Sequence, residues 1–138
     1  MIRFRPSSPV IAALLATTLC MGSAFAQDLK LTGDQEVPSN TSTTVGTGSI
    51  KIDAAGNVSG SVAAPGMAGM AAHIHVGAAG VNGPVIIPLT GSAGDTWTVP
   101  AGAKLTDEQM ADYKAGNLYV NIHTAEHKGG EVRTQLKP

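Results

Sequence analysis

The segment Leu118–His123 reads LYVNIH, and apolar and polar residues alternate along it. In a β-strand, successive side chains point to opposite faces of the sheet. The leucine, valine and isoleucine therefore share one face, while the tyrosine, asparagine and histidine share the other. This alternation predicts a strand that packs one face on a core and turns the other outward.

The same period-two pattern recurs in short segments that are separated by turn residues. The chain has 17 glycines and 8 prolines among 138 residues but only 4% aromatic residues, a composition that favours short strands joined by many turns. We therefore predict an all-β fold, an antiparallel sandwich or barrel of about seven or eight strands. The predicted strands lie at residues 49–53, 58–63, 73–76, 85–87, 97–99, 118–123 and 132–136.

One segment departs from this pattern and predicts a short helix near 106–115. It begins with Thr106-Asp107-Glu108-Gln109, which has the form of a capping box with Thr106 as N-cap. The two acidic residues suit the positive end of a helix dipole, and Gly116 suits the C-terminal stop. We expect this helix to pack on one end of the β fold.

The first 26 residues have the three parts of a secretory signal peptide. Arg3 and Arg5 give a basic start, Val10–Met21 is apolar, and the segment ends in Ala24-Phe25-Ala26. The apolar run is too short to span a membrane. We predict cleavage after Ala26, which leaves residues 27–138 as one periplasmic or secreted domain with no membrane span.

Composition and motifs exclude several function classes. Lys and Arg number 9 against 10 Asp and Glu, so no basic surface for nucleic acid is indicated. Cys20 is the single cysteine, which rules out an internal disulfide or a cysteine-rich metal site. The chain has no G-x-S-x-G, P-loop or dinucleotide-binding motif. The sequence therefore favours a non-enzymatic protein, and we assign no catalytic residue.

All four histidines fall into two segments, and this clustering is the strongest chemical signal in the chain. His73 and His75 are two apart in a predicted strand, so they point to the same outward face. His123 points outward from LYVNIH, and His127 follows in a turn from which it could reach the same surface. If the two strands pair, their imidazoles gather into a metal site.

Two methionines favour copper as the metal. Met67 and Met70 precede the first histidine pair in the pattern Met-x-x-Met-x-x-His-x-His. A thioether is a soft ligand that suits Cu(I) and serves zinc poorly. We therefore predict a copper site formed by His73, His75 and His123, with Met67, Met70 or His127 completing it.

Other interpretations of these residues remain open. The histidines can serve as structural hydrogen-bonding groups, His127 can be a plain surface residue, and Met67 and Met70 can simply pack in a glycine-rich loop. The protein would then be a non-enzymatic module that binds a protein or a polysaccharide. A third alternative is a redox or hydrolytic enzyme that uses the bound metal.

Five sequence blocks, taken in order, resemble those of CHRD (chordin) domains, and the chain looks like a bacterial, secreted, single-domain member. The resemblance covers about residues 29–137, with one departure at Thr134, where the family usually has glycine. The blocks are EVP at 36–38, AHIHV at 72–76, GPV at 83–85, LYVNIHT at 118–124 and GEVR at 130–133.

The resemblance implies architecture more than activity. It implies a secreted or periplasmic all-β domain over 27–138, and it brings no established enzymatic activity. The family's characteristic residues correspond here to Glu36, His73, His75, Tyr119, Asn121, His123, Glu131 and Arg133.

Overall fold

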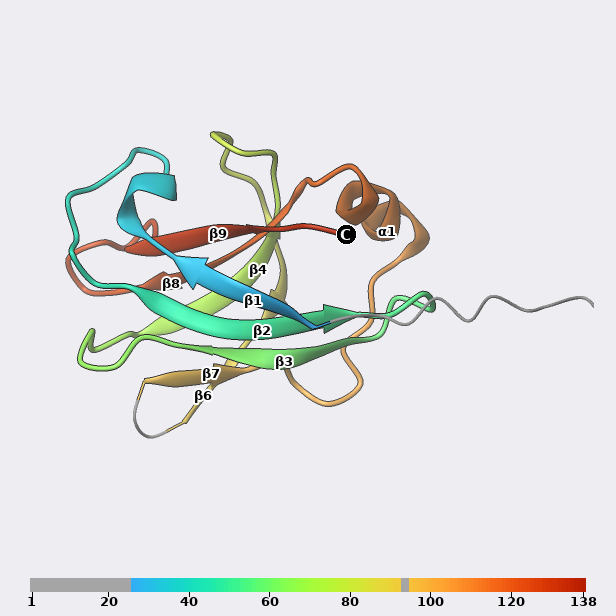
Figure 1. Cartoon of the computed structure of the whole chain (residues 1–138), viewed down its shortest axis with the longest axis horizontal. Helices are drawn as coiled ribbons and strands as arrows, with labels where there is room; N and C mark the ends of the chain where they lie inside the picture. The colour runs from blue at the N-terminus through green and yellow to red at the C-terminus, as the bar shows by residue number, and fades with distance from the viewer. Residues whose placement is uncertain (1–25, 93–94) are drawn as a thin grey trace, which may run out of the picture.

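The computed structural model describes residues 26–92 and 95–138, and Figure 1 shows their arrangement. The predicted signal peptide covers residues 1–26, so all of it except Ala26 lies outside the described residues, and it stays a prediction. Among the described residues, no helix is both long and apolar enough to cross a membrane.

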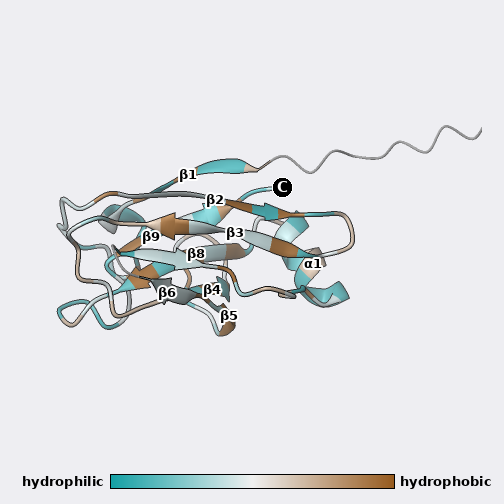
Figure 2. Cartoon of the chain, turned by 90° about the horizontal axis from the view of Figure 1, so that it is seen from below, coloured by the Kyte–Doolittle hydropathy of each residue, from teal (hydrophilic) through white to brown (hydrophobic). Residues whose placement is uncertain are grey.

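The strands form two antiparallel sheets that pack as a sandwich. One sheet has the strand order β1-β2-β3-β7-β6 and the other has the order β5-β4-β8-β9. Figures 1 and 2 show β1, β2 and β3 in one layer and β4, β5 and β8 in the other. This confirms the all-β prediction. The strands are β1 (Gln27–Leu31), β2 (Gly46–Ile52), β3 (Val58–Ala63), β4 (Ala71–Val76), β5 (Val85–Pro88), β6 (Thr90–Ser92), β7 (Thr96–Thr98), β8 (Leu118–His123) and β9 (Val132–Leu136).

The core lies between the sheets and consists of the apolar face that the alternation predicts. Figure 2 shows short hydrophobic stretches along the strands between hydrophilic ones. On β8 the three aliphatic residues of LYVNIH are fully buried, as expected. Burial of these side chains is the main favourable term in the folding of the domain. Other core residues are Leu31, Ile50, Val62, Ile74, Val132 and Leu136.

The two sheets approach each other along both edges without closing into a barrel. On one side, Thr32 after β1 pairs with Arg133 of β9 through backbone hydrogen bonds of 3.2 and 3.0 Å. On the other side, the chain passes from β5 in one sheet to β6 in the other, and the N–H of Leu89 between them donates to Ala72 O at 2.9 Å. These contacts join the two sheets on both sides, while the edge strand β6 stays exposed.

The helix forms where the capping box places it. Helix α1 spans Asp107–Lys114, with Thr106 as N-cap and Ala115 as C-cap. The Gln109 N–H donates to Thr106 Oγ1 at 3.2 Å, and the Thr106 N–H donates to Gln109 Oε1 at 3.0 Å. Strands β1 and β6 were not predicted. The TGS sequence of β6 contains no apolar residue from which alternation could be detected.

Candidate metal centre

Strands β4 and β8 bring three histidines onto one face of the four-stranded sheet. The two strands are antiparallel neighbours in which Ala71 pairs with His123 and His73 pairs with Asn121. His73 and His123 therefore lie diagonally adjacent, and His73 Nδ1 is 3.0 Å from His123 Nε2. One donor nitrogen from each of His73, His75 and His123 lies within 4.8 Å of the other two. The strand pairing assumed from the sequence is thus present.

His75 shares this face but is not outward in the sense that the alternation predicted. Only 7% of the residue is exposed. Its ring stacks on Tyr119 with a centroid separation of 4.6 Å and an interplanar angle of 3°. Nδ1 lies 2.9 Å from Gly83 O, and Nε2 lies 3.0 Å from Asn121 Oδ1. The expectation of an exposed histidine pair is wrong for His75, because loop and strand residues cover the face at that point.

The hydrogen bonds assign the protons of the neutral His73–His123 pair. His123 Nδ1 lies 2.8 Å from Lys128 O, and a carbonyl oxygen can only accept, so this nitrogen carries the hydrogen. His123 Nε2 then holds a lone pair and accepts from His73 Nδ1. A ligand histidine commonly donates its second ring N–H to a carbonyl in this way. The contacts therefore turn His123 Nε2 toward the cluster, where a metal ion would replace the His73 N–H as the partner of its lone pair.

Burial favours the neutral form of His73 and His75, which metal binding requires. Burial lowers the pKa of His73 below its usual 6.5, and repulsion from His123 and His75 lowers it further. Burial also lowers the pKa of His75, although its contact with Gly83 O opposes the shift. A metal ion binds the unprotonated nitrogen, so a lowered pKa widens the pH range in which these residues are available as ligands.

The cluster fits an ion after the imidazoles close on it. Imidazole nitrogens bind first-row metals at about 2.0–2.1 Å, so two ligand nitrogens of a tetrahedral site lie about 3.4 Å apart. The limit of 4.8 Å in the structure leaves a closing movement of up to about 1.4 Å for His73, His75 and His123. Both ring nitrogens of His75 face oxygen acceptors, and a neutral imidazole donates to only one of them, so the other nitrogen keeps its lone pair for a metal ion.

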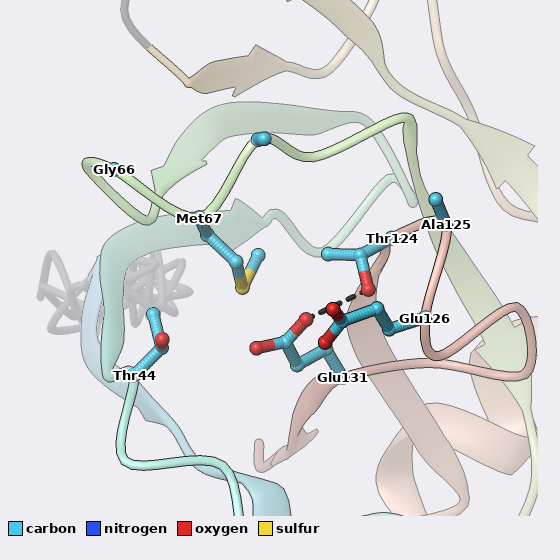
Figure 3. Close-up of a pocket in the computed structure, with 8 residues that line it drawn as sticks. Thr44, Gly66, Met67, Thr124, Ala125, Glu126 and Glu131 are labelled. Carbon is cyan, nitrogen blue, oxygen red and sulfur yellow. Dashed lines mark hydrogen bonds between the residues drawn. The ribbon is translucent and has the colours of Figure 1, made fainter.

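Met70 lies beside the histidines, whereas Met67 and His127 do not. Met70 is 66% exposed and lines the same hollow as the three histidines. Met67 is buried and lines a neighbouring hollow with Thr124 and Glu131, where Thr124 donates to Glu131 at 2.7 Å (Figure 3). His127 lines a third hollow beside the 37–40 segment. Both residues follow turns, and strand periodicity gives no direction for a side chain in a turn.

The sequence comparison agrees with this architecture. A sequence model of the CHRD domain matches residues 28–136. The chain belongs to the CHRD domain family. No curated protein and no solved structure matches the chain. The match covers nearly all of the described residues, and both the two-sheet architecture and the features of the histidine face come from the geometry of this CHRD domain itself.

The CHRD domain buries an acid next to the histidine face, and sequence reasoning gave this acid no role. Glu36 is buried, and its Oε1 has no hydrogen-bond partner among the described residues. Burial raises the pKa of Glu36 to about 7, against the charge of Arg133 and the Asn121 amide, which lower it. The Asn121 amide thus acts both on Glu36 and on His75. The EVP block marks this residue, but no spacing in the sequence indicates its burial.

Arg133 is the second buried charge of the CHRD domain, and it fixes the loop that holds His75. Its guanidinium lies 3.4 Å from the Tyr119 ring centroid and donates to Ala78 O and Val81 O at 2.9 and 3.0 Å. Tyr119 of β8 thus lies between His75 of β4 and Arg133 of β9. Through the 77–83 loop, Arg133 helps to place the Gly83 carbonyl against the His75 ring.

Proposed function

We propose that this CHRD domain binds one metal ion, with copper favoured, through His73, His75 and His123. The observation that carries the proposal is the convergence of three imidazoles from two paired strands, with donor atoms within 4.8 Å. Three protein ligands leave one coordination position open. A site of this kind suits the storage or delivery of copper, because an ion with an incomplete ligand set can be passed to another carrier.

The preference for copper depends on Met70. Its exposed side chain lines the histidine hollow, and its thioether can reach a bound ion without unfolding any part of the core. Mixed imidazole and thioether ligands suit copper in both oxidation states, whereas zinc gains little from sulfur of this type. Met67 and His127 line other hollows, so the proposal retains Met70 alone as the additional ligand.

Copper titration of untagged protein tests the proposal. We expect the His73→Ala and His123→Ala variants to lose at least 100-fold in Cu(II) affinity, because each removes a ligand. His127→Ala is the matched control, and we expect it to bind as the wild type does. Met70→Leu should weaken Cu(I) more than Cu(II), with Met67→Leu as its control. Equal Cu(II) binding by His73→Ala and His127→Ala would overturn the proposal.

The pH dependence adds a second readout. Because the pKa values of His73 and His75 lie below 6.5, their imidazoles stay neutral to lower pH than free histidine does. We expect the loss of copper affinity that is due to protonation of His73 and His75 to occur below pH 6.5. A loss of affinity centred above pH 6.5 would argue against these ligands.

A second candidate function is a protein- or polysaccharide-binding module with structural histidines. The observation that favours it is that His75 and His123 already have protein partners at Gly83, Asn121 and Lys128. This candidate predicts no metal above background in protein purified without a tag. It also predicts that adding copper leaves the unfolding temperature unchanged, whereas a ligand that binds the native state raises it.

The location of the protein is part of the proposal. The basic start, apolar run and small residues before Gln27 support export to the periplasm or the medium. The intact mass of the exported protein should correspond to residues 27–138. Recovery of the full-length chain from that compartment would contradict the cleavage that we propose.

A further inference from the structure

The hollow over the histidine cluster is lined by more than the three proposed ligands. It has a volume of about 310 Å³ and is open to solvent. Besides the three imidazoles, its lining consists of Met70, Ala71, Val85, Thr124 and Lys128. The Thr124 hydroxyl donates to Glu131 and is thus engaged outside this hollow. Imidazole edges, aliphatic groups and one lysine therefore make up its wall.

Charge selects the kind of ligand that fits there. The described residues that line the hollow include no Asp or Glu, and neutral imidazoles leave the charge of a divalent ion uncompensated. The neighbouring hollow around Met67 is the opposite case, since Glu126 and Glu131 line it (Figure 3). A ligand that completes the coordination in the histidine hollow is consequently favoured if it is an anion.

The aliphatic wall selects the body of that ligand. Val85 is 47% exposed on the edge strand β5, next to its register partner His75. Met70, on the approach to β4, is 66% exposed, and these two are among the few large apolar side chains that the described structure leaves in water. Apolar groups in contact with them would leave water, at about 0.8 kcal/mol per buried methylene group or about fourfold in affinity.

We propose that, with Cu(II) bound, this hollow binds a small aliphatic monocarboxylate, whose carboxylate takes the coordination position that the Met70 thioether takes on Cu(I) and whose alkyl group lies against Met70 and Val85. The inference rests on the proposed metal site. It goes beyond that site because it names a ligand class and assigns Val85, which is not a metal ligand, to ligand selection. The ligand is defined by a single negative charge and a compact apolar body.

The test is a titration of the Cu(II)-loaded, untagged protein with formate, acetate, propionate and isobutyrate at constant ionic strength. The Cu(II) visible absorption and electron paramagnetic resonance spectra report coordination. Ultrafiltration checks that the copper stays bound to the protein. We expect affinity to rise along the series by about two- to fourfold per added carbon, with metal-free protein binding none of the four.

Two valine variants test whether the aliphatic wall causes the rise in affinity along the carboxylate series. Val85→Ser should keep wild-type affinity for Cu(II) and for formate but show a smaller rise toward isobutyrate, because Met70 remains. Val81→Ser is the matched control, because Val81 is 52% exposed but does not line the hollow. We expect it to show the full rise.

The outcomes separate this inference from the metal site itself. Copper binding without any spectral response to carboxylates overturns the inference and leaves the metal site intact. Equal affinity for all four acids, equal behaviour of the two valine variants, or loss of copper to the filtrate also overturns it. Absence of copper binding overturns both proposals.

Discussion

The outer face of the five-stranded sheet carries Thr47, Lys51 and Ser59 in exposed positions, whereas the outer face of the four-stranded sheet buries Tyr119, Asn121 and Arg133. Both faces carry polar residues at the alternating positions of their strands. The first face is left to water, and the second is covered by loops. A period-two pattern thus identifies the inner face of a strand in both sheets. It does not tell whether the outer face is exposed to solvent or covered by loops.

Specific hydrogen bonds hold the loops over the outer face of the four-stranded sheet. Arg133 donates to carbonyls of the 77–83 loop, and Asn82 of that loop donates to Val37 O at 2.7 Å. Asn40 donates to Glu131 O at 3.0 Å. Most buried polar groups in proteins are paired in this way, because an unpaired one costs free energy. The covered face is therefore the part of the molecule where single polar side chains matter most.

The largest expected effect is the loss of Arg133. Arg133→Ala leaves the carbonyls of Ala78 and Val81 without their donor and removes the cation from the Tyr119 ring. We expect the free energy of unfolding to fall by about 3–5 kcal/mol. Lys51→Ala, on the open face, should change it by less than about 0.5 kcal/mol. Urea denaturation measures both, and a loss below 1 kcal/mol for Arg133→Ala would show that the cover is dispensable.

The next largest expected effect is the contribution of Glu36 to the free energy of unfolding, which depends on pH. Its pKa is raised from 4.5 to about 7 in the folded protein, so the native state holds a proton that the unfolded state releases. The stability due to this group is complete below about pH 4.5 and is lost as the pH rises through 7. With allowance for solvent screening, the loss amounts to about 1–3 kcal/mol.

Glu36→Gln isolates this contribution. The difference in unfolding free energy between wild type and variant should shift by that amount between pH 4.5 and pH 8, to the disadvantage of the wild type. Asp34→Asn, at an exposed position two residues earlier in the η1 turn (Gly33–Gln35), is the control. A pH-independent difference for Glu36→Gln would show that the acid titrates normally.

For the four-stranded sheet, the sequence predicts which residues form the inner face but only part of the arrangement on the outer face. LYVNIH specifies which side chains enter the core, and the His-x-His spacing correctly places His73 and His75 on one face. Burial of His75 depends on Gly83 and on Arg133, which is separated from the carbonyls that it holds by 52 and 55 positions. The loop has no periodicity that would fix its path. Contacts of this range become visible only once the strands are assembled.

The two histidines of β4 give a smaller effect in metal-free protein. His75 stacks on Tyr119 and contacts Gly83 O and Asn121, so we expect His75→Ala to lower the unfolding free energy by about 1–3 kcal/mol. His73 is half-buried and contacts His123, so His73→Ala should cost less than about 1 kcal/mol. Thermal unfolding at pH 7.5 with a chelator compares them. Equal losses would mean that the cover over His75 contributes nothing.

The smallest expected effect is a gain on the open face. Ser61 of β3 lies between its register partners Ser49 of β2 and Thr98 of β7, and the side chains of this row meet solvent at least in part. Threonine fits an exposed strand position better than serine, because its methyl group packs on cross-strand neighbours. Ser61→Thr should therefore raise the free energy of unfolding by about 0.2–0.5 kcal/mol, seen as a higher urea midpoint at an unchanged slope.

On the covered face the corresponding change, Asn121→Thr, removes the amide between His75 and Gly129 and should lower stability. If Ser61→Thr instead lowers the free energy of unfolding by more than about 0.5 kcal/mol, the outer face of the five-stranded sheet does not accept a larger side chain. The contrast between the two sheets would then fail.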